Sequence, residues 1–253
     1  MVAAIEKEQP ALVSITGDLV YTGAEEPDWK VWDTETAEWQ QHHIPIYPAL
    51  GNHDLKGDQT TALANYFTRF PQLAQNRYYS VHFGNCLMLV LDSSQDETSG
   101  PQGEWLQQRL NHLTNSTAFV FVVLHHPPYT SSSDDKQFGG GHTARIKEEA
   151  LAQFLEARQQ KLHARIIVFA GHVHNYEHHQ HGGIDYIVSG GGGAHPYAIA
   201  RKPTDLYQSD DVNYHYLLVD VSPQRVVITM NRLDLGSGHP VWSQPDSVTV
   251  KAR

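Results

Sequence analysis

Four short apolar segments of this chain are each followed by side chains of the kind that bind metal ions. The segments span residues 11–15, 44–50, 119–124 and 165–170, and the side chains that follow them are Asp18, Asn52 with His53, His125, and His172 with His174. Apolar runs of this length are typical of buried strands in an α/β sheet, where ligands bind beyond the carboxyl ends of the strands. Together the four segments predict an α/β fold with a metal site at one edge of its sheet.

The donor atoms indicate a pair of hydrolytic metal ions rather than a structural zinc. A carboxylate such as that of Asp18 has two oxygens with lone pairs and can bridge two ions. Tyr21, three residues later, offers a phenolate, which suits a hard trivalent metal such as Fe(III). Structural zinc sites favour cysteine-rich sets, and this chain has only Cys86.

Length and charge limit the class of protein. The 253 residues, 40% of them hydrophobic, are enough for one core, so we expect residues 1–253 to form a single domain. The net charge of −10 argues against nucleic acid or an anionic membrane as a partner. No run of about 20 apolar residues is present, so no segment is expected to cross a membrane. The first eight residues lack the features of a signal peptide, and nothing in the sequence decides the compartment or the oligomeric state.

The apolar pattern also predicts most of the other elements. Strands are expected at residues 78–83 and 86–91, joined by a turn at 84–85, and antiparallel strands at 184–189, 214–221 and 226–230. Helices are expected near residues 2–9, within 22–43, and around 61–70, 102–113 and 146–155. A loop rich in Ser, Asp and Gly is expected at 130–141.

Several of these segments match a known set of motifs. Gly17-Asp18-x-x-Tyr21, Gly51-Asn52-His53-Asp54, Val122-x-x-His125 and Gly171-His172-x-His174-x-Tyr176-Glu177 resemble, in this order, the motifs of the calcineurin-like metallophosphoesterases. The tyrosine three residues after the aspartate resembles the purple acid phosphatase branch of that superfamily. The resemblance implies two mixed β-sheets that form a sandwich flanked by helices.

The resemblance also implies a role for each metal ligand. Asp18 would bridge the two ions, and Tyr21 with His174 would bind the first, an Fe(III). The second ion, a divalent Fe, Zn or Mn, would be bound by Asn52, His125 and His172.

Four further residues are candidates for catalysis. His53 would contact the substrate phosphate or protonate the leaving group, and Asp54 would orient His53. His126 and His142 are further substrate-facing candidates. For these two histidines a strand end before Pro127 and a solvated loop, respectively, remain equally open interpretations.

One motif of the family is not found in this sequence. The family takes its first metal ligand from an Asp-x-Gly turn on an earlier strand, and the sequence opens at the following helix. Either the start is misassigned and about 20 to 40 residues are lost, or the first ion has three protein ligands. We therefore expect the second metal position to be filled and the first to be weak or empty.

The resulting functional hypothesis is the hydrolysis of phosphate monoesters by a metal-bound hydroxide at a binuclear site. The substrate would be a phosphorylated small molecule or a phosphoprotein. One alternative is a phosphodiesterase of the same superfamily, which Tyr21 argues against. The other is a non-catalytic homologue that binds metal or phosphate and has lost the first metal site.

Overall fold

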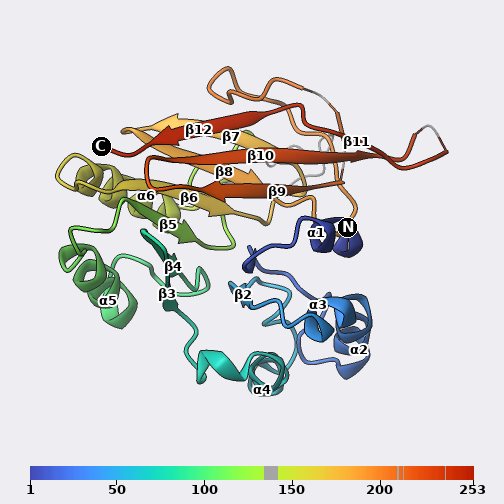
Figure 1. The fold of residues 1–253 in the computed structure, drawn as a ribbon. Helices are drawn as coiled ribbons and strands as arrows, with labels where there is room; N and C mark the ends of the chain where they lie inside the picture. The colour runs from blue at the N-terminus through green and yellow to red at the C-terminus, as the bar shows by residue number, and fades with distance from the viewer. Residues whose placement is uncertain (134–141, 210, 213, 237) are drawn as a thin grey trace.

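A six-stranded sheet forms the centre of the computed structural model, which describes residues 1–133, 142–209, 211–212, 214–236 and 238–253 (Figure 1). Its strand order is β3-β4-β5-β6-β8-β7. The four inner strands are parallel, and the two outer strands, β3 and β7, pair antiparallel with their neighbours. The strands are β3 (Tyr79–Phe83), β4 (Cys86–Val90), β5 (Phe119–Val123), β6 (Arg165–Ala170), β8 (Ile184–Ser189) and β7 (Tyr176–His181).

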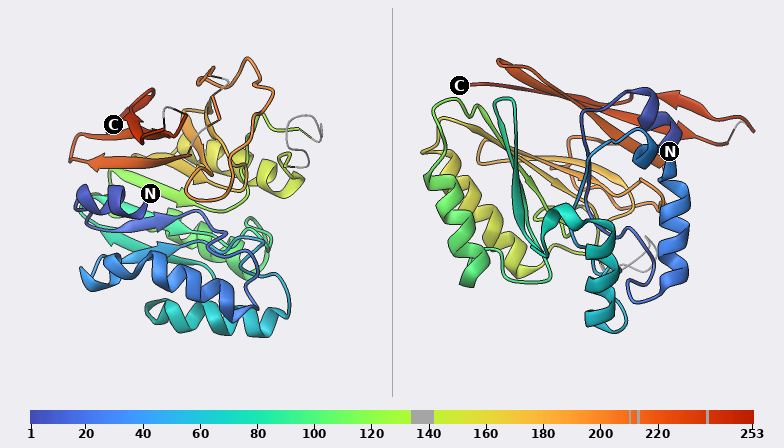
Figure 2. Two further views of the ribbon diagram at one scale, coloured as in Figure 1. Left: turned by 90° about the vertical axis from the view of Figure 1, so that its right-hand side faces the viewer. Right: turned by 60° about the horizontal axis from the view of Figure 1, so that its bottom comes forward.

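Both faces of this sheet are covered, which explains why its inner strands are continuous apolar runs. Every residue of β4 and of β5 is buried, as expected for parallel strands between two layers. The helices α5 (Gly100–Asn111) and α6 (Ile146–Gln159) lie side by side against one face (Figure 2). They contribute Leu106, Leu110, Leu151 and Leu155 to the core on that side.

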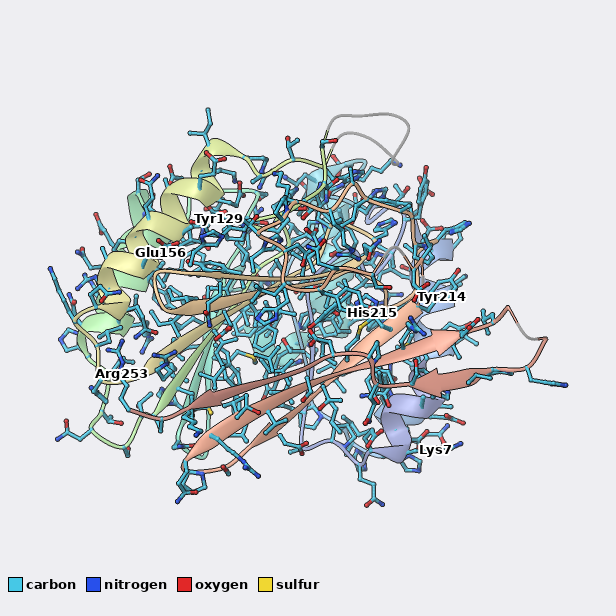
Figure 3. All side chains as sticks on the ribbon, turned by 90° about the horizontal axis from the view of Figure 1, so that it is seen from above. Lys7, Tyr129, Glu156, Tyr214, His215 and Arg253 are labelled. Atoms are coloured by element: carbon cyan, nitrogen blue, oxygen red, sulfur yellow. The ribbon has the colours of Figure 1, made fainter. Side chains whose placement is uncertain are left out.

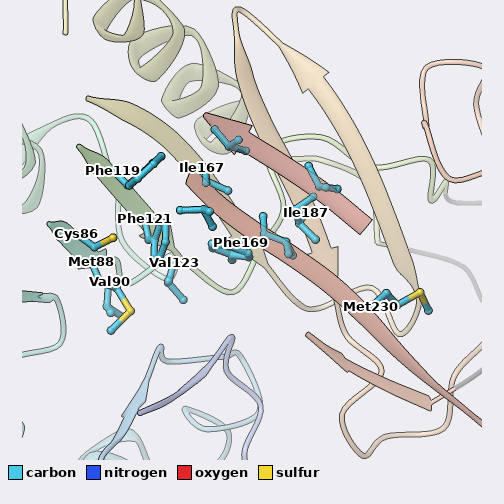
Figure 4. Packing of buried hydrophobic residues seen from close by; sticks show 14 of the residues in the cluster. Cys86, Met88, Val90, Phe119, Phe121, Val123, Ile167, Phe169, Ile187 and Met230 are labelled. Carbon is cyan, nitrogen blue, oxygen red and sulfur yellow. The ribbon is translucent and has the colours of Figure 1, made fainter. Parts of the chain in front are cut away.

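A four-stranded sheet covers the opposite face. It contains β9 (Tyr214–Val221), β10 (Arg225–Asp234), β11 (Val241–Ser243) and β12 (Ser247–Lys251), and all its pairings are antiparallel. Along β12 buried and exposed residues alternate, the pattern of a strand with one face in the core. Figure 4 shows Phe121, Phe169 and Met230 among the apolar side chains packed between the two sheets.

The N-terminal part of the chain forms a smaller layer beside β3 (Figure 1). Strands β1 (Val13–Ile15) and β2 (Ile46–Pro48) pair in parallel. The helices of this part are α1 (Val2–Lys7), α2 (Glu26–Glu35), α3 (Ala37–Gln41), α4 (Gln59–Arg69) and the 3-10 turn η1 (Pro71–Leu73). Their aromatic residues form a separate core that includes the buried Trp29 and Trp39.

The α/β fold predicted from the sequence is confirmed, with three differences in detail. Only the six-stranded sheet is mixed, because the second sheet is antiparallel throughout. Strand β8, expected among antiparallel strands, pairs antiparallel with β7 but parallel with β6. Strand β7 was not predicted, because its sequence is polar and contains three histidines. The loop expected at 130–141 lies outside the described residues from 134 onward.

A helix that crosses a bilayer needs about 20 predominantly apolar residues, and none of the described helices meets both conditions.

Candidate metal centre

The strand ends deliver the predicted side chains to one edge of the fold. His125 follows β5 and His172 follows β6, two neighbouring parallel strands whose carboxyl ends lie together. Asp18 and Asn52 follow β1 and β2, the other parallel pair. The backbone carbonyl of Thr16, at the end of β1, lies 2.8 Å from His125 Nδ1 and so joins the two pairs.

Two of the candidate ligands have a left-handed backbone. The φ angles of Asp18 and His172 are 56° and 66°. Such a conformation costs a side-chain-bearing residue about 1–3 kcal/mol and persists only where surrounding contacts enforce it. At Asp18 the enforcing contacts are visible, since the buried Asp54 carboxylate accepts the backbone N–H groups of Asp18, Leu19 and Gly51 at 2.8–2.9 Å.

These contacts of Asp54 are with the backbone, whereas the resemblance implied that Asp54 orients His53. Its carboxylate binds the backbone of both N-terminal turns, whereas the ring of His53 is held by the backbone carbonyl of Tyr21, 2.7 Å from Nδ1. Burial, with a smaller contribution from the Asp18 charge, raises the pKa of Asp54 to about 7 although the backbone N–H groups oppose the shift.

Gly51 allows the two turns to approach each other. A Cβ atom at this position would lie 2.1 Å from Asp18 Oδ1, far closer than any real contact. The same Asp18 oxygen accepts the backbone N–H of His53 at 2.8 Å. Glycine is therefore required for Asp18 to occupy its place between the turns.

The centre of the site is an accumulation of lone pairs around His125 Nε2. Because a carbonyl oxygen only accepts, the contact with Thr16 places the proton of His125 on Nδ1 and leaves a lone pair on Nε2. This lone pair faces the Asp18 carboxylate oxygen Oδ2 at 3.2 Å, Asn52 Oδ1 at 3.0 Å and His172 Nδ1 at 3.1 Å. Lone pairs gathered in this way repel one another unless a cation lies among them.

The spacing of these donor atoms fits a metal ion. A metal with bonds of about 2.1 Å and bond angles of about 90–109° separates neighbouring donor atoms by roughly 3.0–3.4 Å. The three distances from His125 Nε2 fall within or at the edge of this range. Mixed nitrogen and oxygen donors of this kind suit Zn, Mn or Fe.

The protonation states also favour metal binding. Burial, together with the nearby His125 and His142, lowers the pKa of His172 to about 3, so its imidazole is neutral. Burial likewise lowers the pKa of His174. Burial alone would raise the pKa of Asp18, but its contacts with His125 and with the backbone N–H of His53 outweigh this and lower it. Neutral imidazoles and an ionised carboxylate are the forms that coordinate metals.

The two predicted ligands of the first metal, His174 and Tyr21, lie outside the group of donor atoms around His125 Nε2. His174 Nδ1 lies 3.1 Å from the carbonyl of His195, and its ring packs against Tyr197. The Tyr21 side chain is 70% exposed and contacts the ring of His53 and Lys56 Nζ. In the described part of the chain no hydrogen bond or ring contact joins Tyr21 to His174.

His126 and His142 both lie beside the candidate ligands. The ring of His126 packs against His125 and His172, with ring centres 4.7 and 4.3 Å away. The ring of His142 lies 4.5 Å from that of His172. Nitrogens of His125, His126 and His172 all lie within 4.8 Å of one another, so geometry alone would also allow His126 to bind a metal.

A second buried polar group, Glu177, His179 and Asp205, is explained by its hydrogen bonds. Glu177 accepts from Thr130 Oγ1 at 2.6 Å and from the backbone N–H of Ser131, and it pairs with His179 at 3.0 Å. Asp205 pairs with Arg201 at 2.6 Å. This network fixes the segment that follows β5. Figure 3 shows a second anchor of the same segment, Tyr129, whose hydroxyl donates to Glu156 of α6 at 2.8 Å.

Known proteins identify the family. A model described as calcineurin-like phosphoesterase matches residues 1–176. The chain belongs to this family. Among curated proteins, the probable purple acid phosphatase 20 of Arabidopsis thaliana is 27% identical over 176 residues, covering 64% of this chain and 39% of that protein. Purple acid phosphatase 15 of the same plant is 29% identical over 163 residues, covering 60% of this chain and 28% of that protein.

Solved structures share the fold. The purple acid phosphatase PPD1 of yellow lupin (Lupinus luteus) superimposes with a TM-score of 0.71 at 19% identity, over 98% of this chain and 47% of that one. A dimetal phosphatase of Danio rerio gives 0.61 at 14% identity, over 100% of this chain and 87% of that one. The chain thus spans less than half the length of the purple acid phosphatases it resembles.

Proposed function

We propose that this calcineurin-like phosphoesterase hydrolyses phosphate monoesters at a binuclear metal centre. The observation that carries the proposal is the convergence of Asp18, Asn52 and His172 on the unprotonated Nε2 atom of His125 at 3.0–3.2 Å. The relatives named as purple acid phosphatases support a phosphatase of the same kind.

The candidate ligands divide between two positions. Asn52, His125 and His172 would hold a divalent Fe, Zn or Mn, and Tyr21 with His174 would hold Fe(III), with Asp18 shared between them. When bound, such a pair supplies a reactive hydroxide from water and neutralises the charge on the phosphoryl oxygens. It would also offset the net charge of −10, which otherwise repels an anionic substrate.

His53 is suited to protonate the leaving group. Its Nδ1 atom is fixed by the carbonyl of Tyr21, so in the imidazolium form the Nε2–H is the proton left to donate. The backbone N–H of His53 donates to Asp18, which ties the position of this acid to that of the shared carboxylate. General acid assistance is worth about 10²–10⁴-fold in rate.

Two other functions compete with this proposal. A phosphodiesterase would use the same centre on a diester. A non-catalytic role is the second alternative, and a structure with this fold, GAP50, is described as the anchor in the inner membrane complex of Plasmodium; it superimposes with a TM-score of 0.62 at 15% identity.

A direct assay separates these functions. Purified protein supplied with Fe, Zn or Mn is tested on p-nitrophenyl phosphate and on bis(p-nitrophenyl) phosphate. We expect a higher kcat/KM for the monoester, and loss of turnover in His125→Ala. Preference for the diester would favour the phosphodiesterase, and no turnover of either ester by metal-loaded protein would favour the non-catalytic homologue.

A further inference from the structure

Ser93 is a buried hydroxyl with two contacts to one residue of the site. It lies just beyond the end of β4, and its side chain is fully buried. Its Oγ atom accepts the backbone N–H of His126 at 3.2 Å and lies 2.8 Å from His126 Nδ1. Both the backbone and the ring of His126 are therefore held by a single hydroxyl group.

The positions of the protons follow from these two contacts. A serine hydroxyl has one proton to donate, and a buried donor left without an acceptor costs about 1–3 kcal/mol. The backbone N–H of His126 already donates to Oγ, and the acceptor in reach of the Ser93 proton, among the described residues, is His126 Nδ1. If Ser93 donates to Nδ1, the neutral imidazole carries its proton on Nε2.

Charged side chains hold the backbone of Ser93 in place. Its backbone carbonyl accepts from Arg145 Nη2 at 2.7 Å and also from Lys147 Nζ. Arg145 is paired with Glu148, and Lys147 lies 3.7 Å from both Glu148 and Glu97, two carboxylates that are fully buried. These contacts link Ser93 to the first turn of α6 and hold its hydroxyl in place.

We propose that Ser93 is a positioning residue that holds the His126 ring with Nε2–H directed at the substrate phosphate, so that His126 is a hydrogen-bond donor and not a metal ligand. The inference rests on the proposed function, because it assumes that a phosphate binds beside His125 and His172. It resolves the ambiguity left by geometry, since a nitrogen that carries a proton has no lone pair for a metal.

The test compares Ser93→Ala, His126→Ala and the double variant with the wild-type protein, all loaded with the same metal. The readouts are KM and kcat for p-nitrophenyl phosphate, the Kd of inorganic phosphate by calorimetry, and metal content. We expect Ser93→Ala to raise KM and the phosphate Kd by roughly 3- to 10-fold, the value of about one hydrogen bond, with metal content unchanged. Ser93→Ala should have no further effect once His126 is absent.

Two controls separate positioning from a general loss of structure. Ser94→Ala removes the neighbouring exposed hydroxyl, which contacts Arg77 and not the site, and should change neither KM nor Kd. Ser93→Thr keeps the hydroxyl and should restore part of the phosphate affinity. Circular dichroism and thermal unfolding monitor the folded fraction of each variant.

The proposal is overturned by a Ser93→Ala effect of equal size with and without His126, or by loss of metal in His126→Ala. A nitrogen-15 spectrum of the histidine side chains gives an answer that does not depend on turnover, since it reports whether His126 carries its proton on Nε2. If the protein hydrolyses no ester, the proposed function fails while this spectrum and the phosphate Kd still test the role of Ser93. A proton found on Nδ1 of His126 would contradict it.

Discussion

His125 Nε2 lies 3.2 Å from Asp18 Oδ2 and 3.0 Å from Asn52 Oδ1. This relationship joins the carboxyl end of the six-stranded sheet to that of the separate β1-β2 pair. Strands β5 and β6 carry the two histidines, and strands β1 and β2 carry Asp18 and Asn52, so neither pair of strands could form the site alone. The packing of the N-terminal layer against the main sheet is therefore a condition for assembling the candidate metal site.

Replacing Tyr21 tests the identity of the first metal. If Fe(III) binds there, the protein should show a visible tyrosinate-to-iron charge-transfer band, and Tyr21→Phe should remove it because the phenolate oxygen is gone. An absorption spectrum of iron-loaded protein measures this. Tyr197→Phe is the matched control, since the ring of Tyr197 packs against the predicted iron ligand His174. A band that disappears in Tyr197→Phe and persists in Tyr21→Phe would assign the ligand to Tyr197.

Replacing His53 tests the assignment of the general acid. His53→Ala should lower kcat by about 10²–10⁴-fold and leave the bound metal in place, because His53 donates a proton and does not coordinate. Steady-state kinetics and metal analysis of the same sample give both values. His82→Ala, on the exposed side of β3, should leave both unchanged. Loss of metal in His53→Ala would show that His53 is a ligand.

The buried Glu97 predicts a pH dependence of stability. Burial, and then the neighbouring Glu148 carboxylate, raise the pKa of Glu97 from 4.5 to about 8. Between these values the folded protein binds more protons than the unfolded chain, so the free energy of unfolding falls as pH rises from about 4.5 to about 8. The contribution is fully present below the unfolded pKa, and its slope is at most about 1.4 kcal/mol per pH unit.

Urea unfolding at pH 5 and pH 9 measures this slope. Glu97→Gln should flatten it and should stabilise the protein at pH 9, where the wild-type carboxylate is ionised without full solvation. Glu104→Gln, on the exposed face of α5, should leave the slope unchanged. Equal slopes for wild type and Glu97→Gln would show that Glu97 ionises normally.

Much of the arrangement of the candidate site could be predicted from the sequence because parallel strands bring their carboxyl ends together. Asp18, Asn52, His125 and His172 were recognised by their places after apolar runs, and the structure brings them into contact. The fold class followed from the same runs and from the ordered motifs, and the family model confirmed the family.

Other features depend on contacts that no local pattern encodes. Strand β7 has the sequence YEHHQH, which lacks aliphatic residues, and it is a strand because it pairs with β8 and buries His178 and His179 in polar contacts. Ser93 was missed because a lone serine after a strand has no signature, and its partner His126 lies on another strand end. Asp54 was recognised, but its contacts with backbone N–H groups carry no sequence signal.

Metal content tests the central claim most directly. The donors of the second position converge, whereas Tyr21 is exposed and contacts His53 and Lys56. We therefore expect mass spectrometry of the purified protein, after dialysis against Fe and Zn, to find the second position filled and the first only partly filled. His125→Ala should lose the tightly bound ion and phosphatase activity together, while His126→Ala keeps the ion. Full activity in metal-free protein, or unchanged metal content in folded His125→Ala, would contradict the account.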